Sequence, residues 1–222
     1  MDIRLRGKTP IVVGGTGLYI KALVDGLATL PPADEAIRAE LLAKAQCHGR
    51  EKLHEELTRV DPVSARKIPP TNIQRLIRAL EVYLLTGRPI SEWHRKTRRP
   101  TNETFAMIGL SWPRTLLHKN IEKRSHDILP GMIREARTIL KKGYSEDCPA
   151  LQSLGYREAL AYLRGGITKN ELLERLNRST RQFAKRQMTW FRGDPRIRWI
   201  PCGSGFKASQ IAQETLKLIR TY

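Results

Sequence analysis

The fold is organised around the stretch Ser179-Thr-Arg-Gln-Phe-Ala-Lys-Arg-Gln-Met-Thr-Trp-Phe-Arg-Gly-Asp-Pro195. The capping-box pattern Thr168-x-x-Glu171 predicts that a helix begins upstream of it, and Gly193-Asp-Pro195 predicts where that helix ends. A helix of about 23 residues between these signals would be roughly 35 Å long. We therefore expect one long helix to carry the whole stretch.

This expected helix combines a basic face with an apolar one. Arg178, Arg181 and Lys185 share one side, at helical spacing. The apolar residues on or near another side are Leu172, Leu176, Phe183 and Trp190. A basic stripe backed by an apolar stripe suits a polyanion such as RNA; the alternative is an ordinary core helix with a solvated basic face.

The composition describes a soluble globular chain with a strong basic excess. The 222 residues carry 40 Lys and Arg against 22 Asp and Glu, a net charge of +18 spread along the chain. Such an excess favours a large anionic partner, most simply nucleic acid. We expect no membrane span and no signal peptide, because no apolar run is long enough. Cys47, Cys148 and Cys202 are isolated, which argues against a zinc cluster or a disulfide framework and indicates a cytoplasmic setting.

The first residues predict a short strand at 9–15 that runs into a glycine turn, followed by a helix from Thr16. Strand, glycines and helix N-terminus form a generic anion-binding arrangement, although most such turns are only tight αβ geometry. The nearby Gly7-Lys8-Thr9 resembles the end of a P-loop, but Asp2 stands where its first glycine would be, and the tripeptide precedes the strand. We interpret it as a turn.

The remaining elements suggest two strand-bearing ends around a helical block. Residues 1–30 and 105–222 would form an α/β core, and residues 31–104 a mostly helical insertion, with a polar, basic loop at 94–104. Helices are expected at about 34–49, 51–59, 71–86, 131–142 and 207–220. One further helix should begin at about residue 116, and another should end at about residue 163. Strands are expected at 105–112 and 196–200.

Several stretches together resemble the tRNA dimethylallyltransferases, also called tRNA isopentenyltransferases. The stretches, in the family order and over nearly the whole chain, are Pro10-Ile-Val-Val-Gly-Gly-Thr-Gly-Leu-Tyr19, 27–34, Gln74-Arg-Leu-Ile-Arg-Ala-Leu-Glu-Val-Tyr83, 86–89, 121–124, 152–158 and Thr180-Arg-Gln-Phe-Ala-Lys-Arg-Gln-Met-Thr-Trp-Phe-Arg192. The resemblance implies a P-loop NTPase-like parallel-sheet core, incomplete here, with a helical insertion that grips the anticodon stem. It also implies nucleotide (ATP) binding, Mg²⁺ as cofactor and a monomer.

The resemblance implies transfer of a dimethylallyl group from dimethylallyl diphosphate to N6 of the adenosine 3′ of the anticodon. Arg124 would stabilise the departing diphosphate, for which a bidentate guanidinium is suited, and Thr16 would lie by the reaction channel. Trp190 and Phe191 are interpreted as core residues rather than base-stacking platforms. The residues expected to contact tRNA are Thr16, Arg38, Gln74, Arg75, Leu76, Ile77, Arg78, Gln152, Ser153, Leu154, Gly155, Tyr156, Arg157, Thr180, Arg181, Gln182, Phe183, Ala184, Lys185, Arg186 and Gln187.

The sequence departs from the family pattern at its beginning. Family members start with a Gly-rich P-loop that binds diphosphate, followed by an Asp-Ser-containing segment that supplies the general base, and these 222 residues contain neither motif. We expect most of the magnesium site to be absent too, little or no transferase activity, and low stability, because the sheet would lack strands.

Three functional hypotheses remain open. The first is a tRNA dimethylallyltransferase, and the second is a non-catalytic RNA-binding remnant with the same basic face. The third is an adenylate isopentenyltransferase, which acts on a free nucleotide and needs neither the insertion nor the charge of +18. Salt dependence distinguishes the two RNA-binding hypotheses from the third, because RNA binding weakens steeply with salt and binding of a small nucleotide much less.

Overall fold

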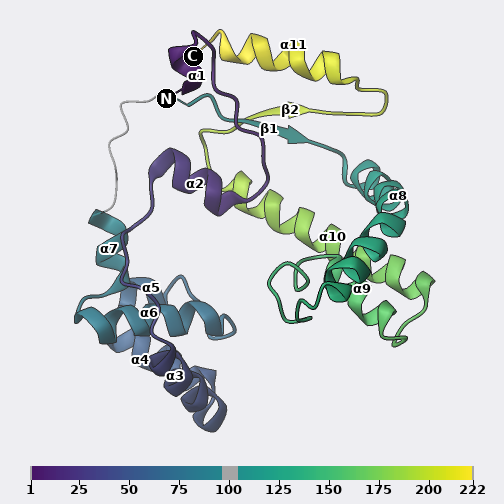
Figure 1. Cartoon of the computed structure of the whole chain (residues 1–222). Helices are drawn as coiled ribbons and strands as arrows, with labels where there is room; N and C mark the ends of the chain where they lie inside the picture. The colour runs from purple at the N-terminus through teal and green to yellow at the C-terminus, as the bar shows by residue number, and fades with distance from the viewer. Residues whose placement is uncertain (1, 97–104, 222) are drawn as a thin grey trace. The chain divides into compact units, whose positions relative to one another are not determined.

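The structure is a computed structural model that describes residues 2–96 and 105–221, and it divides into two units (Figure 1). One unit contains the chain up to Gly17 and from Phe105 onward, and the other begins at Leu18. The sequence places the insertion at 31–104, so the structural unit takes in more of the chain on its N-terminal side. Each unit has its own helices and its own core.

The unit that begins at Leu18 is helical. Three of its helices start at residues that cap them: the side chains of Asp34, Asp61 and Asn72 accept backbone N–H bonds. Gly87 ends the third long helix in the left-handed conformation that glycine adopts most easily. The helices are α2 (Gly17–Asp25, which starts one residue before the unit), α3 (Glu35–His48), α4 (Arg50–Val60), α5 (Pro62–Ala65), α6 (Ile73–Thr86) and α7 (Ile90–Lys96).

The core of this unit lies between α3, α4 and α6. Leu53, Leu57, Leu76 and Val82 are completely buried there, and Trp93 packs against the cluster from α7. The apolar residues recur at helical spacing, so each helix contributes one face to the same core. The predicted helix positions in this part of the chain are confirmed.

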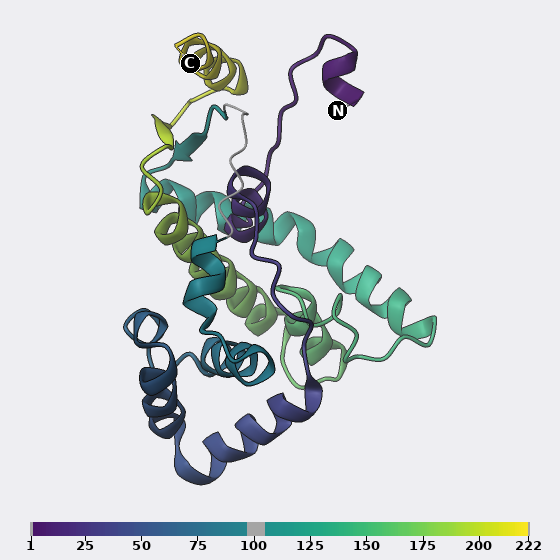
Figure 2. The same ribbon diagram turned by 90° about the vertical axis from the view of Figure 1, so that its left-hand side faces the viewer.

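The other unit holds a small parallel sheet and several helices, three of which pack on one another. Strand β1 (Ile108–Ser111) pairs in parallel with β2 (Arg198–Pro201), in the register Ile108 to Arg198. The helices are α1 (Asp2–Leu5), α8 (Arg114–Lys141), α9 (Tyr156–Leu163), α10 (Lys169–Arg192) and α11 (Ala208–Ile219). Helices α8 and α10 lie against one another and α9 contacts both, as Figures 1 and 2 show. A mixed helical fold with a small parallel sheet therefore agrees with the predicted α/β class.

The strand predicted at residues 9–15 is not formed. These residues lie outside any regular element, and the side chains of Ile11, Val12 and Val13 are exposed. A strand needs a neighbour to complete its backbone hydrogen bonds, and the sheet that the described residues form has two strands only, β1 and β2. The apolar run is therefore β-prone by composition but has no ladder partner.

The two helices predicted from residue 116 and at 131–142 are one helix, α8, which continues through Pro130. Pro130 removes one backbone donor and costs about 3 kcal/mol inside a helix. Against this cost, Ile121, Ser125, Leu129 and Ala136 fall on one stripe and are buried. Packing of this stripe against α9 and α10 outweighs the local penalty, which the sequence pattern alone did not reveal.

Candidate functional site

Helix α10 has the boundaries that the sequence predicts. Thr168 Oγ1 accepts the N–H of Glu171, and the Glu171 carboxylate accepts the N–H of Thr168, which is the expected capping box. Leu172 and Leu176 are buried against α8 and α9. Further along, Phe183 is 41% exposed and Trp190 is 43% exposed, so the expectation that Trp190 is a core residue was wrong.

The cations of α10 are distributed over an exposed surface. Arg178 and Lys185 are exposed, and the Arg186 guanidinium lies 5.8 Å from the centre of the Phe183 ring. Arg181 forms an ion pair with Glu122 of α8 and so also holds two helices together. Among the predicted tRNA contacts on this helix, Gln182 is exposed, and Thr180 and Ala184 are half-buried.

The loop before α2 is held against α10. The side-chain amide of Gln187 donates a 3.0 Å hydrogen bond to the carbonyl of Gly15. A Cβ at Gly15 would stand 2.2 Å from the same amide nitrogen, and a Cβ at Gly17 would stand 2.2 Å from the indole of Trp190. These glycines therefore allow close approach to α10, and the exposed Thr16 lies between them.

Glu158 is a buried residue that sequence reasoning missed. Its carboxylate accepts the N–H of Gly155 at 2.8 Å and the hydroxyl of Ser179 on α10, also at 2.8 Å. Gly155 has φ +93°, a conformation that other residues rarely adopt. Glu158 therefore fixes the predicted tRNA-contacting turn to the helix that carries the other predicted contacts. The signal was the glutamate three residues after a glycine that opens a helix.

Residues 152–157, the turn that leads into α9, present exposed side chains as well as hydrogen-bonded ones. Gln152 donates to the carbonyl of Glu146 at 2.9 Å, Ser153 donates to the carbonyl of Ala150 at 2.6 Å, and Leu154 and Arg157 are exposed. Tyr156 donates a 2.6 Å hydrogen bond to Glu135 of α8, and this bond, together with burial, raises the pKa of the Tyr156 phenol.

Arg124 lies on the exposed side of α8, one residue before the buried Ser125. Among the described residues it has no ion pair or hydrogen bond, in contrast to Arg181. Its guanidinium is therefore available for an anion. The structure places it on a helix that contacts α10, but gives it no direct contact with Thr16.

In the helical unit, two predicted tRNA-contacting arginines are bound to one buried carboxylate. Glu81 of α6 is fully buried and accepts bonds from Arg78 (2.5 Å), from Arg38 (2.8 and 3.3 Å) and from the N–H of Asp34 (2.8 Å). Arg78 also donates to the carbonyl of Pro31 at 2.7 Å. Both arginines thus hold the loop before α3 to α6, and sequence reasoning did not identify Glu81.

Electrostatics agree with this arrangement. Burial alone would raise the pKa of the Glu81 carboxyl, but the hydrogen bonds from Arg78, Asp34 and Arg38 outweigh it and lower that pKa. The bond to Glu81 also raises the pKa of Arg38. The charges of the two guanidiniums are therefore largely committed inside the unit.

The remaining predicted contacts on α6 separate by burial. Gln74 and Arg75 are exposed, whereas Leu76 is completely buried and Ile77 packs on the core. The side chain of Leu76 cannot contact RNA, because it belongs to the hydrophobic core. Only the exposed side of this segment remains a candidate contact surface.

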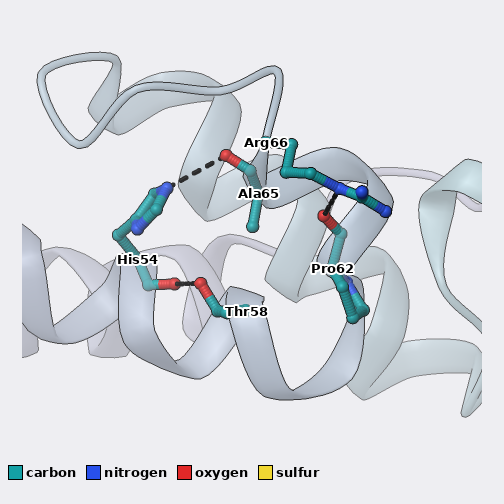
Figure 3. Close-up of a pocket in the computed structure, with 5 residues that line it drawn as sticks. All are labelled: His54, Thr58, Pro62, Ala65 and Arg66. Atoms are coloured by element: carbon teal, nitrogen blue, oxygen red, sulfur yellow. Dashed lines mark hydrogen bonds between the residues drawn. The ribbon is translucent and has the colours of Figure 1, made fainter.

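Two other features carry no site. Residues 2–96 and 105–221 contain no group of three His, Cys, Asp or Glu side chains that could hold a metal ion. An open hollow is lined by His54, Thr58, Pro62, Ala65 and Arg66 (Figure 3). Its polar groups are occupied locally: His54 bonds the carbonyl of Ala65, and Arg66 bonds that of Pro62.

The fold defines a basic α/β protein with a helical unit, and comparisons with known proteins specify its family. A family model described as IPP transferase matches residues 1–194. The chain is 43% identical to the tRNA dimethylallyltransferase of Geobacter sulfurreducens over 207 residues, covering 92% of this chain and 67% of that protein. The chain belongs to the IPP transferase family.

Further relatives and solved structures agree. The tRNA dimethylallyltransferase of Geobacillus thermodenitrificans is 41% identical over 220 residues, which is 98% of this chain and 70% of that protein. The tRNA isopentenylpyrophosphate transferase of Bacillus halodurans matches with a TM-score of 0.63 at 35% identity, covering 99% of this chain and 68% of that one. A eukaryotic dimethylallyltransferase acting on tRNA matches with a TM-score of 0.66 at 25% identity, covering 99% and 59%.

The chain thus spans about two thirds of the length of the curated relatives it matches. These relatives are prenyl-transferring enzymes of tRNA modification by name, which confirms the predicted family. Among the described residues, no helix is long and apolar enough to cross a membrane.

Proposed function

We propose that the chain acts in the transfer of a dimethylallyl group from dimethylallyl diphosphate to N6 of the adenosine 3′ of the anticodon in tRNA. One observation carries the proposal most directly. Between Ser179 and Arg192 there are four cations and no carboxylate, and Gln187 of this segment holds the loop that contains Thr16. An RNA-attracting surface therefore adjoins a candidate reaction centre.

The chemistry assigns a task to each part. The amine nitrogen of adenosine forms a bond to C1 of the dimethylallyl group, the C1–O bond breaks, and diphosphate leaves with the electron pair. A base takes the proton that the nitrogen releases. Arg124 would neutralise charge that develops on the diphosphate, since its guanidinium is exposed and unpaired among the described residues. Thr16, at the N-terminus of α2, would lie beside the adenine that is modified.

The tRNA would be held by phosphate contacts and by the predicted turn. Exposed candidates are Gln74, Arg75, Arg157 and Lys185, while Arg38 and Arg78 would act mainly by shaping the surface through Glu81. We infer a monomer that binds one anticodon stem-loop. Magnesium and ATP binding remain expectations of the family, and no step is assigned to them.

The test is transfer of labelled dimethylallyl, with magnesium present, to an anticodon stem-loop with adenosine 3′ of the anticodon. The control stem-loop carries inosine there, which lacks the exocyclic amine. Product from adenosine and none from inosine supports the proposal. Salt-sensitive binding without product favours the non-catalytic RNA-binding function, and transfer to free adenylate favours the nucleotide-prenylating one. The proposal is overturned if the folded chain neither forms product nor binds the stem-loop.

A further inference from the structure

Glu158, in the first turn of α9, is a buried carboxylate in a chain whose net charge is +18. Its Oε2 accepts the backbone N–H of Gly155 at 2.8 Å. Its Oε1 accepts the hydroxyl of Ser179 at 2.8 Å and lies 3.6 Å from a guanidinium nitrogen of Arg157. Three partners from two segments of the chain therefore share one carboxylate.

These partners belong to, or adjoin, the two segments of this unit that the family resemblance implies as tRNA contacts. Gly155 and Arg157 lie in the turn 152–157, and Ser179 directly precedes residues 180–187 of α10. Glu158 and Ser179 are 21 residues apart in the chain, so their hydrogen bond joins the two segments across the fold. We call this bond, together with the bond from Gly155, the Glu158 lock.

The start of α9 is packed closely against both neighbouring helices. Gly155 has φ +93°, and a Cβ there would stand 2.7 Å from the terminal methyl group of Met132 on α8 and 3.3 Å from Leu176 on α10. The next residue, Tyr156, donates a hydrogen bond to Glu135 of α8. The turn is thus attached to α8 through Tyr156 and to α10 through the Glu158 lock.

The sign of its charge shows that Glu158 does not serve to attract RNA. A carboxylate repels phosphate groups, and burial of a carboxylate is costly unless hydrogen bonds compensate for the lost water. The bonds from Gly155 and Ser179 supply this compensation. What the carboxylate contributes beside a predicted RNA contact is therefore the placement of the turn.

We propose that Glu158 is a positioning residue for RNA binding, which locks the turn 152–157 to α10 through Ser179 so that both segments meet one RNA as a preformed surface. This inference rests on the proposed function and names a residue that acts through others. A preformed surface binds more tightly, because less conformational freedom is lost on binding. Breaking the lock should therefore weaken RNA binding, even where the substitution removes a negative charge.

The decisive variant is Glu158→Gln, because its two possible effects on RNA binding have opposite signs. Removal of a negative charge by itself strengthens binding to a polyanion. Loosening of the turn weakens binding, and we expect a loss of about tenfold to a hundredfold in affinity for an anticodon stem-loop, measured by calorimetry. The matched control is Glu174→Gln, which removes the same charge from an exposed position of α10 and should bind at least as tightly as the parent.

Ser179→Ala breaks the lock without changing any charge. It should weaken stem-loop binding about threefold to tenfold, and Ser179→Thr, which keeps the hydroxyl group, should recover the lost affinity. In the transfer reaction, KM for the stem-loop should rise while kcat stays within about twofold of the parent, because the reacting groups are not moved. Thermal unfolding gives the folded fraction of each variant, since a loss of stability alone leaves the Kd of the folded molecules unchanged.

Hydrogen exchange at the Gly155 amide reports the lock without any RNA. This N–H is bonded to Glu158, so it should be protected in the parent. In Ser179→Ala the carboxylate loses its attachment to α10, and exchange at Gly155, followed by NMR, should become about threefold to tenfold faster. Glu174→Gln should exchange at the rate of the parent.

Defined results overturn the inference. If Glu158→Gln binds the stem-loop as tightly as the parent or more tightly, the carboxylate acts only through its charge. If Ser179→Ala keeps the affinity of the parent, or its exchange rate at Gly155, then α10 does not hold the turn. A parent chain that binds no stem-loop removes the proposed function instead, and exchange at Gly155 in Ser179→Ala then decides whether the lock exists.

Discussion

On α6, the fully buried carboxylate of Glu81 accepts a 2.5 Å hydrogen bond from the guanidinium of Arg78, three residues earlier. Arg38 of α3 binds the same carboxylate from the other side. One buried charge therefore organises two arginines and the loop that precedes α3. Arg78, which the resemblance implies as a tRNA contact, therefore also holds the loop before α3 to α6 in the folded chain.

The first prediction concerns Glu81→Gln. Loss of the carboxylate leaves two partly buried guanidiniums without their anion, and breaking a buried ion pair costs about 3–5 kcal/mol. We expect a loss of about 3 kcal/mol, the lower end, because Arg38 and Arg78 retain some contact with water. Urea unfolding measures it. Arg75→Gln, an exposed change on the same helix, is the control, and equal stability of the two variants would contradict the assignment.

The second prediction concerns pH. Asp61 is buried and accepts bonds from the N–H and hydroxyl of Ser64 and from the N–H of Ser91, so it caps α5 and fastens the start of α7. Burial raises its pKa, but these bonds outweigh burial and lower the pKa below the ordinary value of about 4. Because the folded pKa is the lower one, this stabilisation is complete above about pH 4 and is lost as pH falls further.

Asp61→Asn should therefore unfold more easily at pH 7, by about 1–3 kcal/mol, and depend less on pH below 4. Chemical unfolding from pH 7 to pH 3 gives both quantities. Asp127→Asn, at an exposed position of α8, should follow the parent throughout. A variant at position 61 that keeps the full acid sensitivity of the parent would show that other carboxyls dominate.

The third prediction tests the close approach of the glycine loop to α10. Gly17→Ala would place a methyl group 2.2 Å from the Trp190 indole, so loop or ring must move, at a cost of about 1–3 kcal/mol. Gly14→Ala meets nothing within 4 Å and has no left-handed backbone to lose, so it should be neutral. Thermal unfolding and Trp fluorescence compare the pair. If both substitutions are equally harmless, the loop does not rest on α10 in solution.

The fourth prediction concerns Arg124. Arg124→Gln removes an exposed charge without a partner among the described residues, so stability should stay within about 0.5 kcal/mol of the parent. Transfer should fall about 100-fold or more if this guanidinium stabilises the leaving diphosphate. Binding of inorganic diphosphate, measured by calorimetry, should weaken in parallel. Lys123→Gln, the exposed neighbour, is the control, and an identical loss there would assign the effect to general charge.

Local signals in the sequence predicted most of the helices correctly. Asp34, Asn72 and Thr168 cap helices because each side chain reaches backbone N–H groups within its own first turn. Such interactions involve neighbours in the chain, so a sequence pattern is sufficient to find them. The family followed from motifs in the same way, since each motif is a short contiguous run.

Local signals failed where distant residues compete. Pro130 predicts a break, but burial of Leu129 and Ala136 keeps α8 continuous. Ile11 and Val12 predict a strand, but no neighbouring strand pairs with them among the described residues. A strand is stable only when a neighbouring strand completes its backbone hydrogen bonds, and packing decides whether a helix breaks at a proline. The residues that supply these interactions lie elsewhere in the chain, so the local sequence does not show them.

The sequence by itself determined the family, the caps, the long basic helix α10 and the excess of positive charge, because composition, short motifs and helical spacing are properties of neighbouring residues. Only the tertiary structure decided which of the candidate residues face solvent. It buries Leu76, commits Arg38 and Arg78 to Glu81, and leaves Phe183 and Trp190 open. Burial and pairing depend on what lies across the fold, and that is set by long-range packing rather than by local pattern.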